Sequence, residues 1–143
     1  WVFDNKLWVE YDAGMVGLEL DDTAEYLNKV IPDFGKYKIR ADSARPESIS
    51  YLKRHGLPFC VGVEKGKGSV EDGIEHIKSY SEVIIHPRCK NTLSEFRLYS
   101  YKTDRLTGEV QPVPVDDNNH YIDALRYALR PLMKGKFDYS RLL

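Results

Sequence analysis

The sequence predicts an α/β fold in which helices flank a mixed central β-sheet. The chain opens with two apolar segments on either side of Asp4-Asn5, a pair suited to a two-residue hairpin turn. After this hairpin, short apolar segments alternate with segments whose apolar residues recur every three or four positions. The chain has 143 residues, the length of one domain. A hairpin followed by alternating strands and helices favours a sheet with both parallel and antiparallel strands.

The composition is that of an ordinary globular protein. Apolar residues make up 42% of the chain and charged residues 30%, enough apolar material for a core without disulfides. Cys60 and Cys89 form neither a C-x-x-C pair nor a cluster with histidine, so we expect reduced thiols and no zinc site. No apolar run approaches the roughly 20 residues that a membrane span needs. We therefore expect a protein of the cytoplasm.

The start of the chain and the charge distribution add two weaker expectations. The chain starts at Trp1 without a Met, directly in an expected strand, which suggests a fragment of a longer protein. The net charge is −1, but residues 1–33 hold eight acidic and two basic side chains, so the excess of basic residues lies in the remainder. Such asymmetry can provide a basic face for a polyanion.

Prolines, glycines and capping residues set the limits of the expected elements. Asp22 with Glu25 resembles a capping box, and Ser69 with Asp72 has the pattern of another helix start. In chain order we expect a hairpin of 2–3 and 6–11, a helix over 20–31, a strand over 37–42, a helix over 46–56, a strand over 58–63, a helix over 69–77, a strand over 83–86, a helix over 90–98, a hairpin of 99–102 and 110–113, and a helix over 119–129.

Asp42 is the first candidate site residue. It stands at the C-terminal end of an expected strand, where open α/β sheets place their ligand crevices. The four residues after it lead straight into a helix that begins at Pro46. Taken alone, an aspartate in this turn can equally be a helix-capping residue.

Asp123 is the second candidate, in the last expected helix. A carboxylate beside an apolar stripe is costly unless it is paired, hydrogen-bonded or bound to a metal. His120 is three residues earlier and projects from the same face, so the two could give a divalent cation one imidazole and one carboxylate. Alternatively, Asp123 simply favours the positive end of the helix. The expected packing stripe comprises Tyr121, Ala124, Leu125 and Ala128.

Residues of these types suit the hydrolysis of phosphodiesters. That reaction requires stabilisation of charge on both the attacking and the leaving oxygen, which two Mg²⁺ or Mn²⁺ ions about 3.5–4 Å apart can supply. Hard oxygen ligands hold such ions. Two aspartates and a histidine are one ligand short of a comfortable set.

Three runs of the sequence resemble the nuclease domain of the large terminase subunit of tailed bacteriophages. They agree with that family in order and spacing, and together they reach from Ala41 to Tyr127. The last is the most specific, because His-x-x-Asp-Ala-x-Arg-Tyr follows a proline-bearing edge strand. The matching runs are Ala41–Ile49 with His55-Gly56, Tyr99–Lys102, and His120–Ala128.

The resemblance implies a domain with an RNase H-like fold, which cuts concatemeric double-stranded viral DNA during genome packaging. It implies that Asp42 is the later-strand aspartate of a site for two divalent cations, that Asp123 is the helical one, and that His120 is a further ligand. The family's first-strand aspartate has no counterpart here, so the first strand is expected upstream of Trp1 or is absent. For the full-length protein, the resemblance implies the small terminase subunit and the portal or procapsid as partners, in the host cytoplasm.

Basic residues near the expected site are candidates for contacts to DNA phosphates, which position a duplex without reading its sequence. Lys102 and Arg105 lie on the second hairpin, and Lys65 and Lys67 lie on the glycine-rich loop at 64–68. For any single one of them, a solvated surface side chain is the simpler explanation. No Gly-x-x-x-x-Gly-Lys-Ser/Thr pattern occurs, so the packing motor of the family is not expected in this chain.

Two other functions stay open on the sequence. A resolvase or integrase of the same fold would prefer a Holliday junction over linear duplex. A non-catalytic module that docks DNA or the portal is motivated by the missing first-strand aspartate, and it would bind no Mn²⁺ at millimolar concentration.

Overall fold

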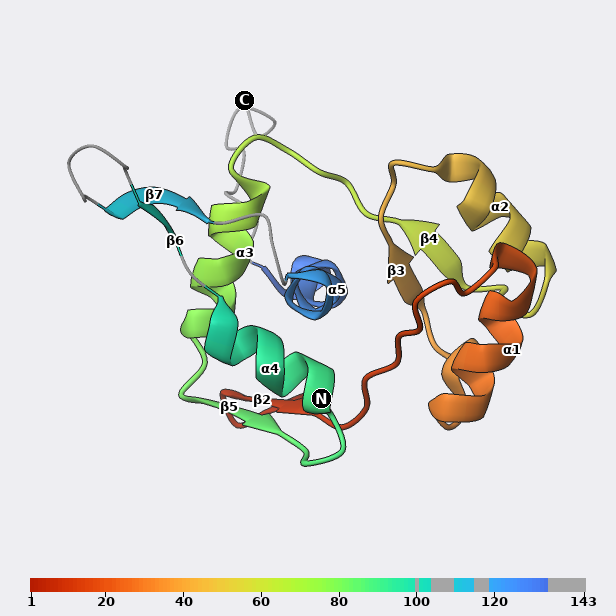
Figure 1. Ribbon diagram of the computed structural model, residues 1–143, viewed down its shortest axis with the longest axis horizontal. Coiled ribbons are helices and arrows are strands. Elements are labelled where there is room, and N and C mark those ends of the chain that lie inside the picture. Colours follow the sequence, from red (N-terminus) through yellow and green to blue (C-terminus); the bar gives the residue numbers. More distant parts are fainter. Residues whose placement is uncertain (100, 104–109, 115–118, 134–143) are drawn as a thin grey trace, which may run out of the picture.

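The helices and strands follow the predicted order, and Figure 1 shows their arrangement. The computed structural model describes residues 1–99, 101–103, 110–114 and 119–133. The strands are β1 (Val2–Phe3), β2 (Lys6–Val9), β3 (Ile39–Ala41), β4 (Cys60–Gly62), β5 (Glu82–Ile85), β6 (Tyr101–Thr103) and β7 (Val110–Pro114). The helices are α1 (Leu20–Val30), α2 (Pro46–Arg54), α3 (Ser69–Lys78), α4 (Lys90–Leu98) and α5 (His120–Leu129), with 3₁₀ turns at Phe34–Lys36 and Arg130–Leu132.

The N-terminal hairpin forms as predicted. Strands β1 and β2 pair antiparallel, with Val2 opposite Leu7. Asp4 and Asn5 both have left-handed backbone conformations, with φ of 49° and 54°. This is the conformation that a two-residue type I′ turn requires, and its twist matches that of the flanking strands. The second strand ends at Val9, two residues earlier than expected.

Replacement of Asn5 tests this turn. We expect Asn5→Val to lower the free energy of unfolding by roughly 1–2 kcal/mol, because a β-branched side chain is strained at positive φ. Asn5→Gly is the matched control and should leave stability unchanged or slightly higher, since glycine adopts this conformation freely. Urea denaturation of both variants measures the difference. Equal midpoints for the two would contradict the left-handed turn.

The strands form three separate sheets. Strand β2 pairs in parallel with β5, so the sheet β1-β2-β5 is mixed, as predicted. Strands β3 and β4 form a parallel pair, and β6 and β7 form an antiparallel hairpin. Within the described residues β1 pairs only with β2 and β3 only with β4, so the expected single central sheet is divided. Helix α5 lies between the two parts and packs on β3, α3 and α4 (Figure 1).

Both predicted helix caps are wrong. Helix α1 begins at Leu20, so Asp22 lies inside its first turn, and Glu19 precedes the helix. Helix α3 begins at Ser69 itself, after Gly68. Gly68 has φ of 76°, a conformation that glycine adopts at no steric cost, so the backbone turn replaces the expected side-chain cap.

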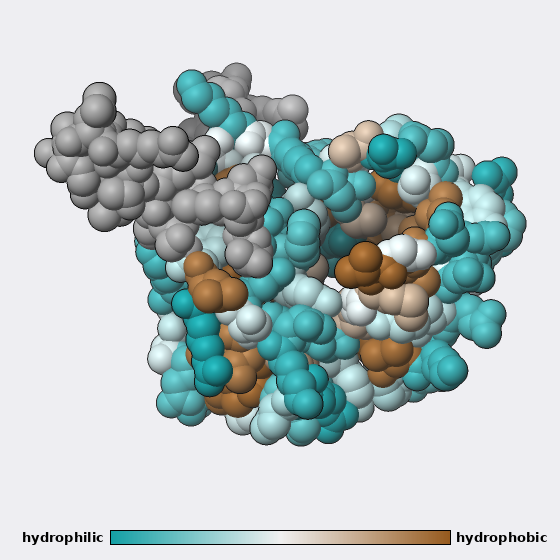
Figure 2. All heavy atoms as spheres, viewed as in Figure 1, coloured by the Kyte–Doolittle hydropathy of each residue, from teal (hydrophilic) through white to brown (hydrophobic). Residues whose placement is uncertain are grey.

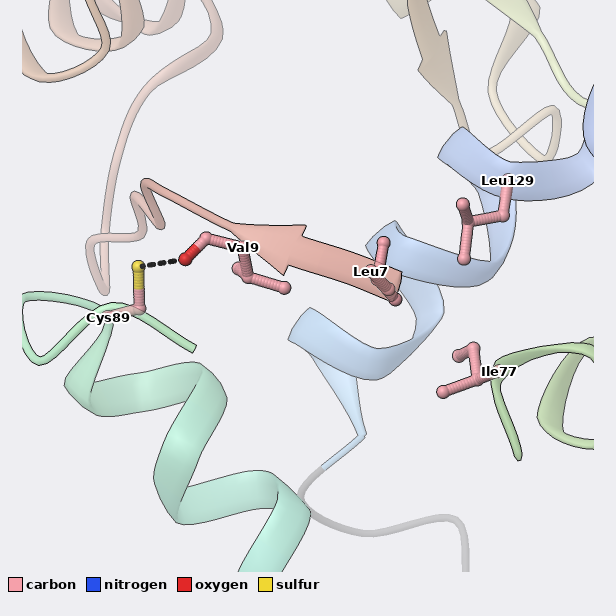
Figure 3. Close-up of a cluster of buried hydrophobic side chains, with 5 residues drawn as sticks. All are labelled: Leu7, Val9, Ile77, Cys89 and Leu129. Carbon is pink, nitrogen blue, oxygen red and sulfur yellow. Dashed lines mark hydrogen bonds between the residues drawn. The ribbon is translucent and has the colours of Figure 1, made fainter. Parts of the chain in front are cut away.

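Two apolar clusters form the core, one in each part of the molecule. The first joins β2, α3 and α5, and Figure 3 shows its side chains pointing toward one another. The second lies between α1, α2 and β4. Figure 2 shows that apolar side chains also reach the surface in groups on either side of the face in view. The clusters contain the two cysteines, which are both buried and unpaired. The buried members are Leu7, Val9, Ile77, Cys89 and Leu129 in the first, and Ala24, Leu57 and Cys60 in the second.

Helix α5 buries a different face from the predicted one. Its buried residues are Ile122, Arg126 and Leu129, whereas Ala124 and Ala128 are exposed. Positions four and three residues apart share one side of a helix. The predicted stripe did not include Arg126, whose guanidinium is paired inside the molecule. Across the described residues, the helices are all too short or too polar to cross a membrane.

Candidate functional site

Asp42 directly follows β3, and both of its carboxylate oxygens accept hydrogen bonds. The backbone N–H of Ala44 donates to Oδ1 at 2.8 Å, which forms the turn toward α2. Lys65 Nζ lies 2.6 Å from Oδ1 and 2.6 Å from Oδ2. The hydroxyl of Tyr127 donates to Oδ2 at 3.2 Å. Arg45 is the N-cap residue of α2 and makes no side-chain capping bond, so Asp42 shapes the turn without capping the helix.

Parallel pairing of β3 with β4 brings Lys65 to Asp42. Ala41 lies opposite Gly62, so both strands end at the same edge and the next residues of each chain segment meet there. The hydrogen bond from Lys65, followed by that from the Ala44 N–H, lowers the pKa of Asp42 below its ordinary value. The same hydrogen bond raises the pKa of Lys65. The pair is therefore an ammonium and a carboxylate at neutral pH.

Asp123 lies in the first turn of α5 and pairs with a buried arginine. Arg126 donates to Asp123 Oδ1 from Nη2 at 2.6 Å and from Nε at 3.2 Å. Its third nitrogen, Nη1, donates to the backbone oxygen of Ser69 at 3.1 Å. Arg126 is only 6% exposed, and Gly73 of α3 lies directly against its aliphatic stem. The guanidinium thus fixes the carboxylate and ties α5 to α3.

A buried carboxylate from the neighbouring helix caps α5. Glu95 of α4 is 7% exposed, and its Oε2 accepts hydrogen bonds from the backbone N–H groups of Tyr121 at 2.7 Å and Ile122 at 3.0 Å. The first N–H groups of a helix have no partner within the helix, and a negative charge is favoured there. Glu95 therefore sets the position of the turn that bears Asp123. This role could not be predicted, because 26 positions separate Glu95 from Tyr121 and no local motif joins them.

Tyr127 connects the two candidate carboxylates. Its hydroxyl bonds Asp42, the ammonium of Lys65 lies 5.4 Å from its ring centre, and the guanidinium of Arg126 lies 5.5 Å from it. Burial raises the pKa of Tyr127, and the charges of Asp123 and Asp42 raise it further. Tyr127 therefore joins the end of β3 to α5, the helix that carries Asp123.

The other predicted residues have diverse positions. His120 is the exposed first residue of α5, one helical turn before Asp123. Lys67 is exposed on the loop that carries Lys65. Lys102 belongs to β6, and Arg105 lies outside the described residues.

Asp12, which the sequence analysis did not place in the site, has a structural role. Its Oδ2 accepts hydrogen bonds from the backbone N–H of Thr92 at 2.9 Å and from the Thr92 hydroxyl at 3.0 Å. Thr92 is in the first turn of α4, so Asp12 secures the start of that helix. It offers no substitute for a first-strand aspartate.

The donor set suits a hard divalent cation in part. Carboxylate oxygens are the ligands that Mg²⁺ and Mn²⁺ prefer, and Asp42 and Asp123 are the two carboxylates that could provide them. Each is held by a basic side chain, Lys65 or Arg126. Over the part of the chain that the structure describes, no three His, Cys, Asp or Glu side chains come together as a metal-binding group.

The fold has a mixed sheet, a parallel strand pair followed by an aspartate, and a second aspartate on a helix packed against that pair, and it matches an RNase H-like nuclease domain. The chain belongs to the family described as the Terminase RNAseH like domain, whose model matches residues 3–130. The resemblance drawn from the sequence is confirmed, and a terminase is favoured over a resolvase or integrase.

Two relatives and one solved structure support the assignment. The chain is 37% identical over 121 residues to the terminase large subunit of Bacillus phage SPP1, and 31% identical over 122 residues to the PBSX phage terminase large subunit of Bacillus subtilis strain 168. These matches cover 82% and 85% of this chain. The crystal structure of the g2p (large terminase) nuclease domain from bacteriophage SPP1 with bound Mn superposes with a TM-score of 0.82 at 34% identity. It covers 90% of this chain and 72% of the crystallised one.

The chain corresponds to a minor part of its relatives. It spans 28% of the length of the SPP1 protein and 27% of that of the PBSX protein.

Proposed function

We propose that this domain is the metal-dependent endonuclease of a viral DNA-packaging terminase, which hydrolyses phosphodiesters of concatemeric double-stranded DNA. The observation that carries the proposal is the contact of Asp42 with Tyr127 of α5, the helix that also carries Asp123, in a chain 34% identical to a nuclease domain crystallised with Mn. An Mn-bound relative supports a divalent cation as the cofactor.

Each residue of the site has a role in this proposal. Asp42 and Asp123 supply carboxylate oxygens to two Mg²⁺ or Mn²⁺ ions, and His120 supplies an imidazole from the same side of α5 as Asp123. Two such ions would stabilise the charge on the attacking and leaving oxygens. Arg126 orients the Asp123 carboxylate through Nη2 and Nε, and Glu95 holds the first turn of α5 in place.

The DNA and the partners are further parts of the proposal. Lys67 is exposed near the site and can contact a phosphate, as can Lys102 and Arg105 if their hairpin adjoins the duplex. The small terminase subunit and the portal or procapsid are proposed as partners of the full-length protein, in the host cytoplasm.

Plasmid nicking with Mn²⁺ tests the proposed function. We expect Asp42→Asn and Asp123→Asn each to reduce the nicking rate by at least about 100-fold, since loss of a direct ligand exceeds the roughly 10–100-fold effect of an outer partner. Asp21→Asn, an exposed aspartate of α1, is the matched control and should nick like the wild type. Circular dichroism verifies that all three variants remain folded. Wild-type nicking rates in both site variants would refute the proposal.

One observation favours a second candidate, a non-catalytic DNA-docking module. The described residues contain no group of three potential metal ligands. Calorimetric titration of the wild-type chain separates the candidates: the nuclease site should bind Mn²⁺, whereas a docking module should show no binding at millimolar Mn²⁺.

A further inference from the structure

The ammonium of Lys65 takes up the face of Asp42 that a cation would use. Its Nζ lies 2.6 Å from both carboxylate oxygens, so it bridges them symmetrically. The remaining contacts of the carboxylate come from the Ala44 N–H on Oδ1 and the Tyr127 hydroxyl on Oδ2. A divalent cation that binds both oxygens must therefore replace Lys65, because the other two donors approach from Asp42's own turn and from α5.

The pair is accessible enough for this replacement. The side chain of Lys65 is 39% exposed and that of Asp42 is 48% exposed. Exposed ion pairs are weak, with a median stabilisation of about 0–1 kcal/mol, and the lysine stem is flexible. In contrast, Arg126 is buried and also anchored on Ser69, so Asp123 keeps its partner far more firmly. Of the two carboxylates, Asp42 is therefore the one whose basic partner, Lys65, can move away.

The side chains that line the hollow beside Lys65 are mostly basic or uncharged. They include Arg126, Arg130 and Tyr127, with Glu64 as the acidic member. The guanidinium of Arg126 is already paired with Asp123 and Ser69, and like charges such as that of Arg130 repel an ammonium.

We propose that Lys65 is an internal counter-cation of Asp42, which a divalent metal ion displaces when it binds both carboxylate oxygens. The inference rests on the proposed function, since it takes Asp42 as a metal ligand. The sequence predicted that Lys65 contacts a DNA phosphate. In the proposal Lys65 instead pairs with Asp42 in the metal-free protein, and it can contact a phosphate only after a metal ion has displaced it. Lys65 thereby lowers the affinity of the site for metal alone.

Calorimetric titration with Mn²⁺ tests the competition. We expect Lys65→Met to bind Mn²⁺ about three- to tenfold more tightly than the wild type, because both the ion pair and the repulsion between the two cations are lost. Lys65→Arg keeps the positive charge and should retain the wild-type affinity. Lys67→Met, on the same loop, is the matched control and should also leave the affinity unchanged.

Nuclear magnetic resonance of the wild type provides a second readout. The side-chain ammonium signal of Lys65 should report the ion pair in the metal-free protein, and saturation with diamagnetic Mg²⁺ should shift or remove it. A signal that stays unchanged at saturating Mg²⁺ would overturn the inference.

The outcomes separate this inference from the proposed function. If Lys65→Met binds Mn²⁺ no more tightly than the wild type, Lys65 is not a counter-cation that competes with metal. The proposed metal site still stands if the wild type binds Mn²⁺ and Asp42→Asn does not. Absence of Mn²⁺ binding in both the wild type and Lys65→Met refutes both.

Discussion

Replacement of Glu95 by alanine is expected to lower the free energy of unfolding by about 2–4 kcal/mol. The change removes the acceptor for two backbone N–H groups at the start of α5, and a donor left unsatisfied in the interior costs about 1–3 kcal/mol. Asn119, which precedes the helix, provides no side-chain cap to take over. Urea denaturation measures the loss. Amide hydrogen exchange at Tyr121 and Ile122 should accelerate in parallel.

Two control variants isolate the capping role of Glu95. Glu95→Gln retains an acceptor oxygen without the charge, so it should lose less stability than Glu95→Ala. Glu25→Ala makes the same change at an exposed site on α1 and should alter stability by no more than about 0.5 kcal/mol. If Glu95→Ala is as stable as Glu25→Ala, Glu95 does not hold α5 in place.

Replacement of Gly73 by alanine is expected to destabilise the protein by about 1–3 kcal/mol. In an exposed helix the same change stabilises by about 1 kcal/mol, because glycine is a poor helix former. Here a Cβ on Gly73 would lie 2.7 Å from Cδ, 3.0 Å from Cγ and 3.2 Å from Cβ of Arg126. These atoms form the root and middle of the side chain, so the clash must displace Arg126 or separate α3 from α5. The cost of such overpacking exceeds the gain in helix propensity.

A double-mutant cycle shows whether Arg126 is the cause. In the background of Arg126→Ala, the Cδ and Cγ contacts no longer exist, so Gly73→Ala should become neutral or stabilising by up to about 1 kcal/mol. Urea denaturation of the four proteins gives the coupling energy. An equal loss in both backgrounds would mean that the glycine is needed for another reason.

The order of the elements was predictable because local signals mark them. Asp4-Asn5 specifies a tight turn, Pro46 suits the start of α2, and Gly56, with φ of 106°, follows its end. The capping residues of the helices that begin at Leu20 and Ser69 were predicted wrongly, since side-chain capping patterns compete with backbone turns such as the one at Gly68. The two hairpins were predicted, but the pairing of β2 with β5 and of β3 with β4 was not predictable, because it depends on contacts between residues far apart in the chain.

The two aspartates of the candidate site were predicted from the sequence, but most of their contacts were not. Asp42 and Asp123 were singled out by their places at a strand end and in the last helix, and by the runs around them. The partners of Asp42 followed no local pattern: Lys65 is 23 positions from it, and Tyr127 is 85 positions from it. Arg126 lies three residues from Asp123 in the same helix, but its bond to Ser69 and its contact with Gly73 depend on the packing of α5 on α3.

The sequence by itself determined the order of helices and strands, the family, and the two aspartates of the proposed site. These depend on backbone preferences and side-chain chemistry, which act over a few residues. Only the tertiary structure decided that Lys65 lies on Asp42, that Arg126 is buried and bonds Ser69, and that Glu95 caps α5. The parallel register of β3 with β4 and the packing of α5 on α3 and α4 create these contacts. Hydrogen bonds and charge pairs act only at close range, so the chain must fold before they exist.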